Sequence, residues 1–449
     1  MRETFVSHAF IITIQNVFSK RLRFWFVEIF FSALTVCGTV SSWILNSNEE
    51  KRYRKFYRYL QRLGRFDERI QSAYESWLIS ALKDALQKED VVRLALDDSP
   101  IKRYGPKIEG AGRMHDPTNM VDKKATCYGH SWVALSLIVE HPKWKTISLP
   151  LRWRFYVPKT NLKEIDEAIR PEFQTKLKIG AELVRQSVAT IRKATDKPIQ
   201  LAFDSGYVSD ELFKAMDELH VVVFTRFKKN TNFYELPEHP TKAKRGRPRI
   251  YGAVFKMKDW IENDQAETFR ECLPQYGGIR SVEFKTMIAT TQITHGRPIR
   301  LVLSRYVDDV KSSDWSVFVS TDLNATPQEI LLEYSRRFSI EEMFKDLKEV
   351  CGLGSQEVRK WESCKACATI TAIGFAFVEV ETWEQSASEL TALRPRWDDA
   401  KRRPSHKNKR DWIARKIAFE NFSRNIIGAK PEDIQKEIFR LASLLGLAV

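Results

Sequence analysis

Four side chains with complementary chemistry lie in one stretch of the sequence, EYSRRFSIEEMFKDLKE. They are Tyr334, Arg337, Glu341 and Lys348. Because no proline or glycine interrupts the stretch, it predicts one continuous helix, on which these side chains share an arc roughly 60° wide. A carboxylate is a hard oxygen ligand for Mg²⁺, and arginine, lysine and tyrosine hold phosphate oxygens. The pattern therefore predicts a metal ion beside a phosphodiester.

The same stretch also fits a purely structural role. Apolar residues form a stripe beside the polar arc, namely Ile340, Met343, Phe344 and Leu347. One side of the helix is therefore expected to be buried. The charged arc could then be a solvated surface held by ion pairs between residues three or four positions apart. The helix alone does not decide between the two interpretations.

Further carboxylates stand at the ends of two predicted strands. VVRLALDDSP runs from alternating apolar residues into Asp97 and Asp98, and IQLAFDSGY runs in the same way into Asp204. Tertiary structure could bring two strand-end acids and the helical Glu341 together, as a metal site requires. Because Asp97 and Asp98 point to opposite faces of a strand, only one of them can serve.

On these residues the chain resembles the DDE transposases of bacterial insertion sequences, in the group that carries the Y-R-E-K signature. The resemblance covers roughly residues 90 to 360, and it includes DDSPIKRYGPKIEGAGRMHDP followed by YGHSWVALSLIV. In that group a β-rich insertion occupies the long gap between the second and third acids. The first acid of the family precedes a small residue and then Ser or Thr, which favours Asp97 over Asp98 as the first ligand.

The resemblance implies a DNA transposase that cleaves at the ends of its insertion sequence and joins the freed 3′-hydroxyl to target DNA. Asp97, Asp204 and Glu341 would hold two Mg²⁺ ions, with Mn²⁺ able to substitute, for an in-line phosphoryl transfer. Phosphates near the cleaved strand would contact the remaining signature residues, Tyr334, Arg337 and Lys348. The expected partners are terminal inverted repeats, target DNA and a second copy of the chain, in a bacterial cytoplasm near the nucleoid.

Two other functions fit parts of the sequence. A transposase-derived DNA-binding protein without catalysis would keep the same fold, although the presence of all three acids gives it little support. A glycoside hydrolase also uses paired carboxylates. Sugar sites, however, rarely place residues such as Arg337 and Lys348 beside the acid.

The order of elements predicts an α/β fold, with a ribonuclease H-like mixed sheet, a β-rich insertion, and helical N-terminal and C-terminal regions. Three sequential strands, a helix, a strand, a helix and a fifth strand are expected in the first part of the core. The predicted divisions are a helical DNA-binding domain (1–88), the first part of the catalytic core (89–227), the insertion (228–325), the closing helix of the core (326–362) and the helical C-terminal region (363–449).

The positive net charge of the chain favours a polyanionic partner. The chain has 73 Lys and Arg against 58 Asp and Glu, a formal net charge of +15. KRYRKFYRYLQRLGR, at 51–65, interleaves basic and aromatic residues and suits phosphate contact. Inward packing of the apolar residues of that segment is an equally good explanation, and the two are compatible.

The most apolar stretch, at 24–45, raises the question of a membrane span. Glu28 and several small polar residues interrupt it, so we expect no span but a buried helix, a turn containing Gly38 and a second helix capped by Thr39. Six cysteines in a chain of 449 residues form no disulfide framework, and no cleavable signal precedes them. A reducing cytoplasm is the expected compartment.

The insertion contains a basic segment, KAKRGRPRIYG at 242–252. Arg245, Arg247 and Arg249 could enter a narrow minor groove, or they could belong to a basic loop that faces the phosphate backbone. Trp260, in the same insertion, could stack on a flipped base or pack in a core.

Overall fold

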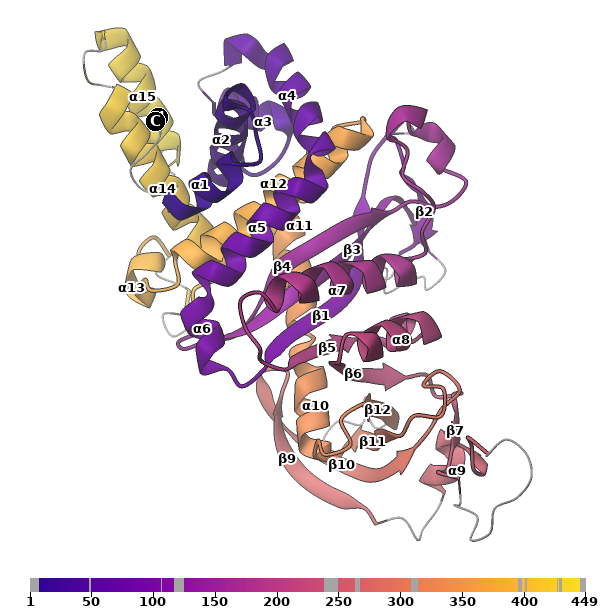
Figure 1. Ribbon diagram of the computed structural model, residues 1–449. Helices are drawn as coiled ribbons and strands as arrows, with labels where there is room; N and C mark the ends of the chain where they lie inside the picture. The colour runs from indigo at the N-terminus through magenta and orange to yellow at the C-terminus, as the bar shows by residue number, and fades with distance from the viewer. Residues whose placement is uncertain are drawn as a thin grey trace.

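A mixed sheet is the centre of the molecule, with helices packed on both of its faces (Figure 1). The computed structural model describes residues 8–47, 50–105, 107–116, 125–237, 249–262, 267–307, 314–394, 398–399, 402–425, 427 and 430–444. In this part of the chain the sheet has ten strands, in the order β2-β3-β1-β5-β6-β12-β11-β10-β9, with β4 paired to β3.

The core of the sheet confirms the predicted ribonuclease H-like order. Its strands are β1 (Val92–Lys102), β2 (Gly112–His115), β3 (Thr126–His141), β4 (Lys145–Tyr156), β5 (Ile199–Phe203) and β6 (Val221–Phe227). Strand β3 is antiparallel to β1, whereas β5 is parallel to β1 and β6 is parallel to β5. The connecting helices are α7 (Lys176–Ile191) and α8 (Asp210–Glu218), with short 3₁₀ turns at η2 (Leu162–Glu164), η3 (Glu167–Ile169) and η4 (Ser205–Tyr207).

The insertion extends this core sheet. Its elements are β7 (Asn232–Tyr234), β8 (Val254–Lys256), α9 (Met257–Ile261), β9 (Phe269–Gln275), β10 (Gly278–Ala289), β11 (Ile299–Tyr306) and β12 (Ser316–Ser320). Because β12 pairs antiparallel with β6, the long strands of the insertion continue the sheet that carries the core. Trp260 is buried and meets Phe255 edge-on, so in this structure it is a core residue and offers no free face to a base.

The N-terminal helices pack against the C-terminal region. They are α1 (His8–Gln15), α2 (Lys20–Thr35), α3 (Val40–Leu45), η1 (Glu50–Arg52), α4 (Tyr53–Arg65), α5 (Asp67–Ala81) and α6 (Lys83–Lys88). The predicted cap is confirmed, because the Thr39 side chain accepts a hydrogen bond from the Ser42 backbone N–H at 3.1 Å. Helix α4 crosses α12 (Trp361–Glu381) so closely that a Cβ atom at Gly64 would lie 1.8 Å from the Glu362 carbonyl oxygen.

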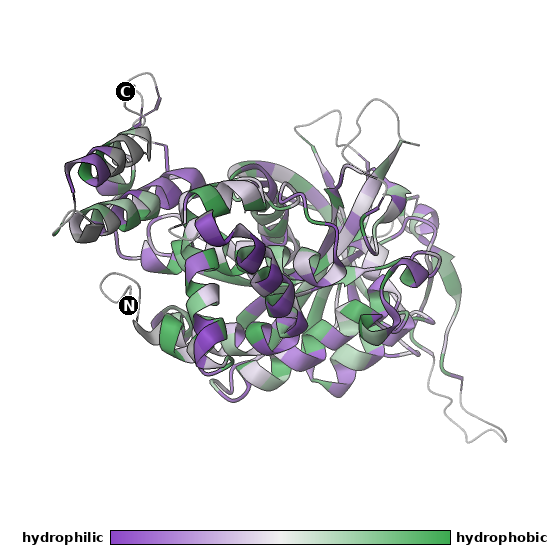
Figure 2. Cartoon of the chain, turned by 90° about the horizontal axis from the view of Figure 1, so that it is seen from above, coloured by the Kyte–Doolittle hydropathy of each residue, from purple (hydrophilic) through white to green (hydrophobic). Residues whose placement is uncertain are grey.

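Helix α12 is also the centre of the helical layer. Among the described residues it is the one helix long and apolar enough to cross a membrane, yet 89% of its apolar window is buried inside the protein. The remaining helices are α13 (Ala387–Leu390), α14 (His406–Asn425) and α15 (Pro431–Leu444). Seen from above, α14 and α15 extend from one side of the body (Figure 2).

The stretch from Tyr334 to Lys348 forms two helices, so the prediction of one continuous helix is wrong. These are α10 (Pro327–Arg336) and α11 (Ser339–Glu349). Between them, the N–H groups of Arg337 and Phe338 bond to carbonyls only three residues earlier, as in a 3₁₀ turn. Helix propensity is a weak local preference that tertiary contacts override, and the buried side chain of Arg337 makes such contacts at this turn.

Candidate functional site

The carboxylates of Asp97 and Asp204 lie next to each other on adjacent strands. Asp204 directly follows the end of β5, as predicted, but the prediction that the first strand ends at Asp97 is wrong, because β1 stays paired with β3 as far as Lys102. In the parallel ladder of β1 and β5, Leu96 is opposite Phe203, so Asp97 and Asp204 follow at matching positions. Their side chains are partly open to solvent, with relative exposures of 20% and 35%. The strand register therefore brings two acids together that are distant in sequence.

One guanidinium joins the first acid to the helical acid. Arg337 donates from Nη1 to Asp97 Oδ2 at 2.8 Å and from Nη2 to Glu341 Oε1 at 2.7 Å. The Arg337 side chain is only 11% exposed, and its Nε has no hydrogen-bond partner among the described residues. The turn between α10 and α11 thus places Glu341 on the same side of β1 as Asp97.

Tyr334 and Arg226 hold the second acid, Asp204. The Tyr334 hydroxyl donates to Asp204 Oδ1 at 3.1 Å, and Arg226 Nη2 donates to the same oxygen at 3.3 Å. The sequence analysis did not single out Arg226. The available signal is its position near the end of β6, where it is the one charged residue in the apolar run VVVFTRF.

Asp98 points to the opposite face of β1. Its carboxylate accepts hydrogen bonds from Lys176 Nζ at 2.6 Å, Ser131 Oγ at 3.0 Å and Tyr207 Oη at 3.1 Å. The Asp98 backbone N–H nevertheless donates to Asp97 Oδ1 at 2.8 Å. Asp98 therefore belongs to a polar network between β1 and α7, and Asp97 is the acid that faces Glu341.

Lys348 lies farther along the same face. Its Nζ donates to Ser99 Oγ at 2.6 Å, and Ser99 is two residues beyond Asp97 on β1. Glu342 points elsewhere, since its Oε2 pairs with Arg403 Nη2 at 3.3 Å. All four residues of the predicted signature arc thus lie on one side of the sheet, although a bent chain, and not a straight helix, brings them there.

Burial dominates the electrostatics of this site. Desolvation raises the pKa of Asp97 to about 6, against the opposing effect of the Arg337 charge. Burial also raises the pKa of Tyr334, so its hydroxyl remains a hydrogen-bond donor. Burial, followed by the nearby Lys102 charge, lowers the pKa of Lys348. Because burial makes Asp97 harder to ionise, a cation beside it would stabilise its charged form.

The type of donor at this site fits a hard divalent cation. Asp97, Asp204 and Glu341 offer only carboxylate oxygens, which are the ligands Mg²⁺ and Mn²⁺ prefer. Within the described residues, no three His, Cys, Asp or Glu side chains are close enough to share one ion. The Arg337 guanidinium takes the place between Asp97 and Glu341, and this shows that a positive charge is accommodated there.

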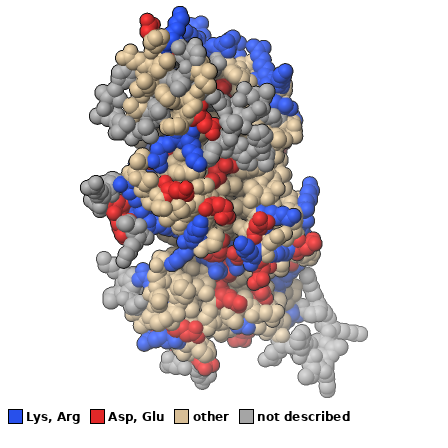
Figure 3. Space-filling model, turned by 90° about the vertical axis from the view of Figure 1, so that its left-hand side faces the viewer, with Lys and Arg blue, Asp and Glu red and all other residues tan. Residues whose placement is uncertain are grey.

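The predicted DNA-contacting segments lie on the surface or outside the described residues. Arg249 is exposed, whereas Arg245 and Arg247 are outside the described part of the chain. On α4, Phe56, Tyr59, Leu60 and Leu63 are buried, whereas Tyr53 and Tyr57 are exposed. A basic face of α4 is also exposed, made up of Arg54, Lys55, Arg58, Arg62 and Arg65. On the side of the molecule shown in Figure 3, basic side chains gather at the top, and acidic and basic ones intermingle below.

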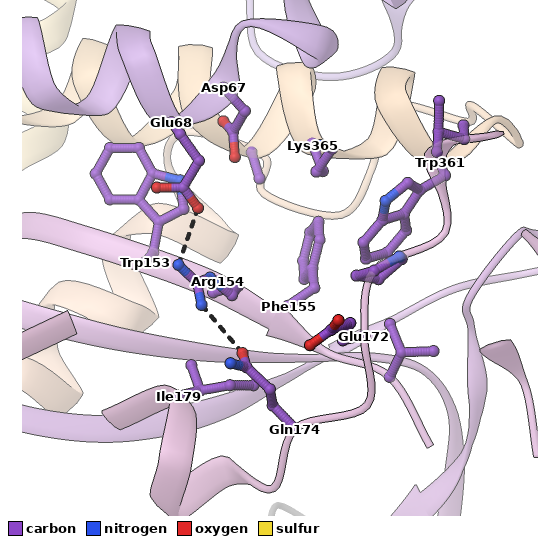
Figure 4. Close-up of a pocket in the computed structure, with 14 residues that line it drawn as sticks. Asp67, Glu68, Trp153, Arg154, Phe155, Glu172, Gln174, Ile179, Trp361 and Lys365 are labelled. Atoms are coloured by element: carbon purple, nitrogen blue, oxygen red, sulfur yellow. Dashed lines mark hydrogen bonds and ion pairs between the residues drawn. The ribbon is translucent and has the colours of Figure 1, made fainter. Parts of the chain in front are cut away.

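A separate cavity of about 280 Å³ lies between α5, β4, α12 and the segment before α7 (Figure 4). Trp153, Phe155 and Trp361 form part of its wall, and Glu68 pairs with Arg154 at its edge. Burial raises the pKa of Asp67, another lining residue, to about 6. No residue that lines this cavity contributes to the acid site.

Comparisons with known proteins identify the family of the chain. The family model described as "DDE superfamily endonuclease" matches residues 32–286, more than half of the chain. The model described as "Archaeal putative transposase ISC1217" matches residues 282–386, which include α10, α11 and α12. No curated protein sequence matches the chain.

Proposed function

Since the chain belongs to the DDE superfamily endonucleases, we propose that it is a DNA transposase whose reaction centre consists of Asp97, Asp204 and Glu341. The main support is the Arg337 guanidinium, which joins Asp97 to Glu341 at 2.8 and 2.7 Å beside Asp204 on the next strand. Acids this far apart in sequence meet only if the fold brings them together.

The three carboxylates would hold the divalent ions. Bound Mg²⁺, or Mn²⁺ in its place, would activate the attacking hydroxyl and stabilise the leaving oxygen of an in-line displacement. Tyr334 would keep Asp204 oriented through its 3.1 Å hydrogen bond. Arg226, Arg337 and Lys348 would bind phosphate oxygens around the scissile bond.

A groove of about 750 Å³ borders the α10–α11 turn, but none of the three acids lines it. Two of its cations, Arg336 and Arg403, already pair with Glu140 and Glu342, which also line the groove. We therefore do not place the DNA strand in this groove.

The remaining parts of the proposal concern recognition. The basic face of α4, with Arg245, Arg247 and Arg249, would contact the terminal inverted repeats and the flanking backbone. A homodimer would hold two element ends and the target DNA together, in the cytoplasm. Residues 1–88 would form the DNA-binding domain, and 228–325 the insertion.

The test is divalent-metal-dependent cleavage of a duplex that carries the terminal repeats flanking the reading frame. Glu341→Gln removes the charge of one proposed ligand, and Glu342→Gln is a matched control, because Glu342 is adjacent and pairs with Arg403. We expect at least a hundredfold loss of cleavage in Glu341→Gln, as for other groups that stabilise transition-state charge, and little change in Glu342→Gln. Equal rates would reject the site, whereas repeat binding without cleavage in the wild type would favour a protein that has lost catalysis.

A further inference from the structure

One residue of the reaction centre occupies space that a metal ion needs. Arg337 binds Asp97 Oδ2 and Glu341 Oε1, two of the oxygen atoms that the proposed function assigns to divalent cations. A cation that coordinates both oxygens must displace at least one of these hydrogen bonds. Without DNA, metal binding therefore competes with an internal guanidinium.

The competition is strong because the guanidinium is well placed. Its two Nη atoms match two carboxylates, and its side chain is 89% shielded from solvent. The centroid of the Tyr334 ring lies 5.5 Å from its Cζ atom, so the aromatic face also stabilises the charge. Arg337 thus neutralises two acids that would otherwise repel each other near β1.

A phosphate group offers Arg337 an alternative partner. Guanidinium groups bind phosphate oxygens in the same two-pronged manner as carboxylates. The route to solvent is open, because Glu341 and Arg226 are 44% and 43% exposed on their side chains. The buried Nε has no hydrogen-bond partner among the described residues, so a move of the guanidinium toward such an anion breaks no hydrogen bond at this atom.

We infer that Arg337 is a placeholder cation that DNA phosphate draws away from Asp97 and Glu341, so that DNA binding and divalent-metal binding strengthen each other. This inference rests on the proposed function. By thermodynamic linkage, DNA must raise metal affinity by the same factor by which metal raises DNA affinity. The protein would then bind its metal tightly only when a substrate is present.

The adjacent Arg336 provides a matched control. It carries the same charge and lies at the end of α10, but its Nε binds Glu140 Oε1 at 3.2 Å and its Nη1 binds Glu333. It makes no contact with the three acids among its described hydrogen bonds. Replacing it alters the local net charge without vacating the space between Asp97 and Glu341.

The experiment measures Mn²⁺ affinity by electron paramagnetic resonance of free Mn²⁺. The proteins are the wild type, Arg337→Gln, Arg337→Lys and Arg336→Gln, each with and without a pre-cleaved terminal-repeat duplex that has no bond left to cut. Without DNA, Arg337→Gln should bind Mn²⁺ about tenfold more tightly than the wild type, a factor within the usual range of coupled sites. DNA should tighten Mn²⁺ binding about tenfold in the wild type and in Arg336→Gln, but hardly at all in Arg337→Gln.

Arg337→Lys keeps the positive charge and is the control for a folding defect in Arg337→Gln. A lysine cannot bridge two carboxylates through a rigid fork, so its Mn²⁺ affinity should lie between those of the wild type and Arg337→Gln. The inference is overturned if the wild type and Arg337→Gln bind Mn²⁺ equally without DNA, or if the DNA effect persists in Arg337→Gln. Failure of all four proteins to bind Mn²⁺, with or without DNA, overturns the proposed metal site as well.

Discussion

Lys348 Nζ lies 2.6 Å from Ser99 Oγ, two residues beyond Asp97 on the same face of β1. The serine thereby ties the last residue of the signature to the strand that carries the first acid. Burial lowers the pKa of Lys348, so the ammonium is disfavoured unless partners such as this hydroxyl solvate it. Ser99 is therefore a positioning residue for Lys348.

Ser99→Ala should weaken DNA binding by about tenfold, because a hydrogen bond to a charged group contributes about 1.5–3 kcal/mol. Ser99→Thr keeps the hydroxyl and should stay close to the wild type. KM for a terminal-repeat duplex, measured with kcat, separates a binding effect from a chemical one. Equal KM values in the alanine and threonine variants would show that the hydroxyl does not position Lys348.

Substitution of Asp97 should remove cleavage activity, whereas substitution of Asp98 should lower stability. Asp97→Asn should abolish cleavage and leave the unfolding free energy nearly unchanged, since desolvation opposes the charged form there. Asp98→Ala leaves Lys176 and Tyr207 without their shared acceptor and should cost about 1–3 kcal/mol of stability. Chemical denaturation and cleavage of the same preparations distinguish the two. An Asp98 variant that is fully stable and wholly inactive would reverse the assignment.

The contact between α4 and α12 should tolerate no side chain at position 64. Gly64→Ala places a methyl group 1.8 Å from the Glu362 carbonyl oxygen, so the helices must separate, at a cost of at least about 2 kcal/mol. Gly278→Ala is the control, because its added Cβ meets nothing within 4 Å. Thermal denaturation should show a clear decrease only for Gly64→Ala. A neutral Gly64→Ala would mean that α4 and α12 do not pack in this way.

A buried charge cluster should make stability depend on alkaline pH. Burial lowers the pKa of His406, but its contacts with Cys351 and Glu379 outweigh this and raise it to about 9. The raised pKa means that the folded state holds the proton more tightly. The contribution of His406 is therefore fully present below its ordinary pKa of 6.5 and is lost as pH rises to about 9.

The unfolding free energy of the wild type should accordingly fall between pH 6.5 and 9. His406→Asn should remove most of this slope, at a lower overall stability. His295→Asn is the control, because His295 is largely exposed and pairs with Asp210 on the surface. A slope unchanged in His406→Asn would show that the imidazole is not the titrating group.

The sequence predicts which charged residues come together better than the route by which the chain brings them together. The apolar runs that lead into Asp97 and Asp204 are local features and are evident from the sequence, but the continuation of β1 beyond Asp97 is not, because it depends on pairing with β3. The bend at Arg337 and Phe338 is not evident, since it depends on contacts of Arg337 with Asp97 on a strand 240 residues away.

Long-range pairing explains what else the sequence leaves open. The strands of the insertion are recognisable, but the pairing of β12 with β6 depends on which sheet edge is free after the core has formed. Arg226 could be noticed only as a charge in an apolar strand, and its 3.3 Å contact with Asp204 depends on the same register. The packing of α4 on α12 likewise joins segments that are about 300 residues apart, so local sequence patterns do not reveal it.

The most direct test of the three-acid site is an anomalous difference map from crystals of the protein with a terminal-repeat duplex and Mn²⁺. We predict a Mn²⁺ peak within bonding distance of the Asp97 and Glu341 carboxylates and beside Asp204, with the Arg337 guanidinium turned toward a DNA phosphate. A map with DNA bound, Arg337 still between Asp97 and Glu341, and no peak at any of the three acids would contradict the account.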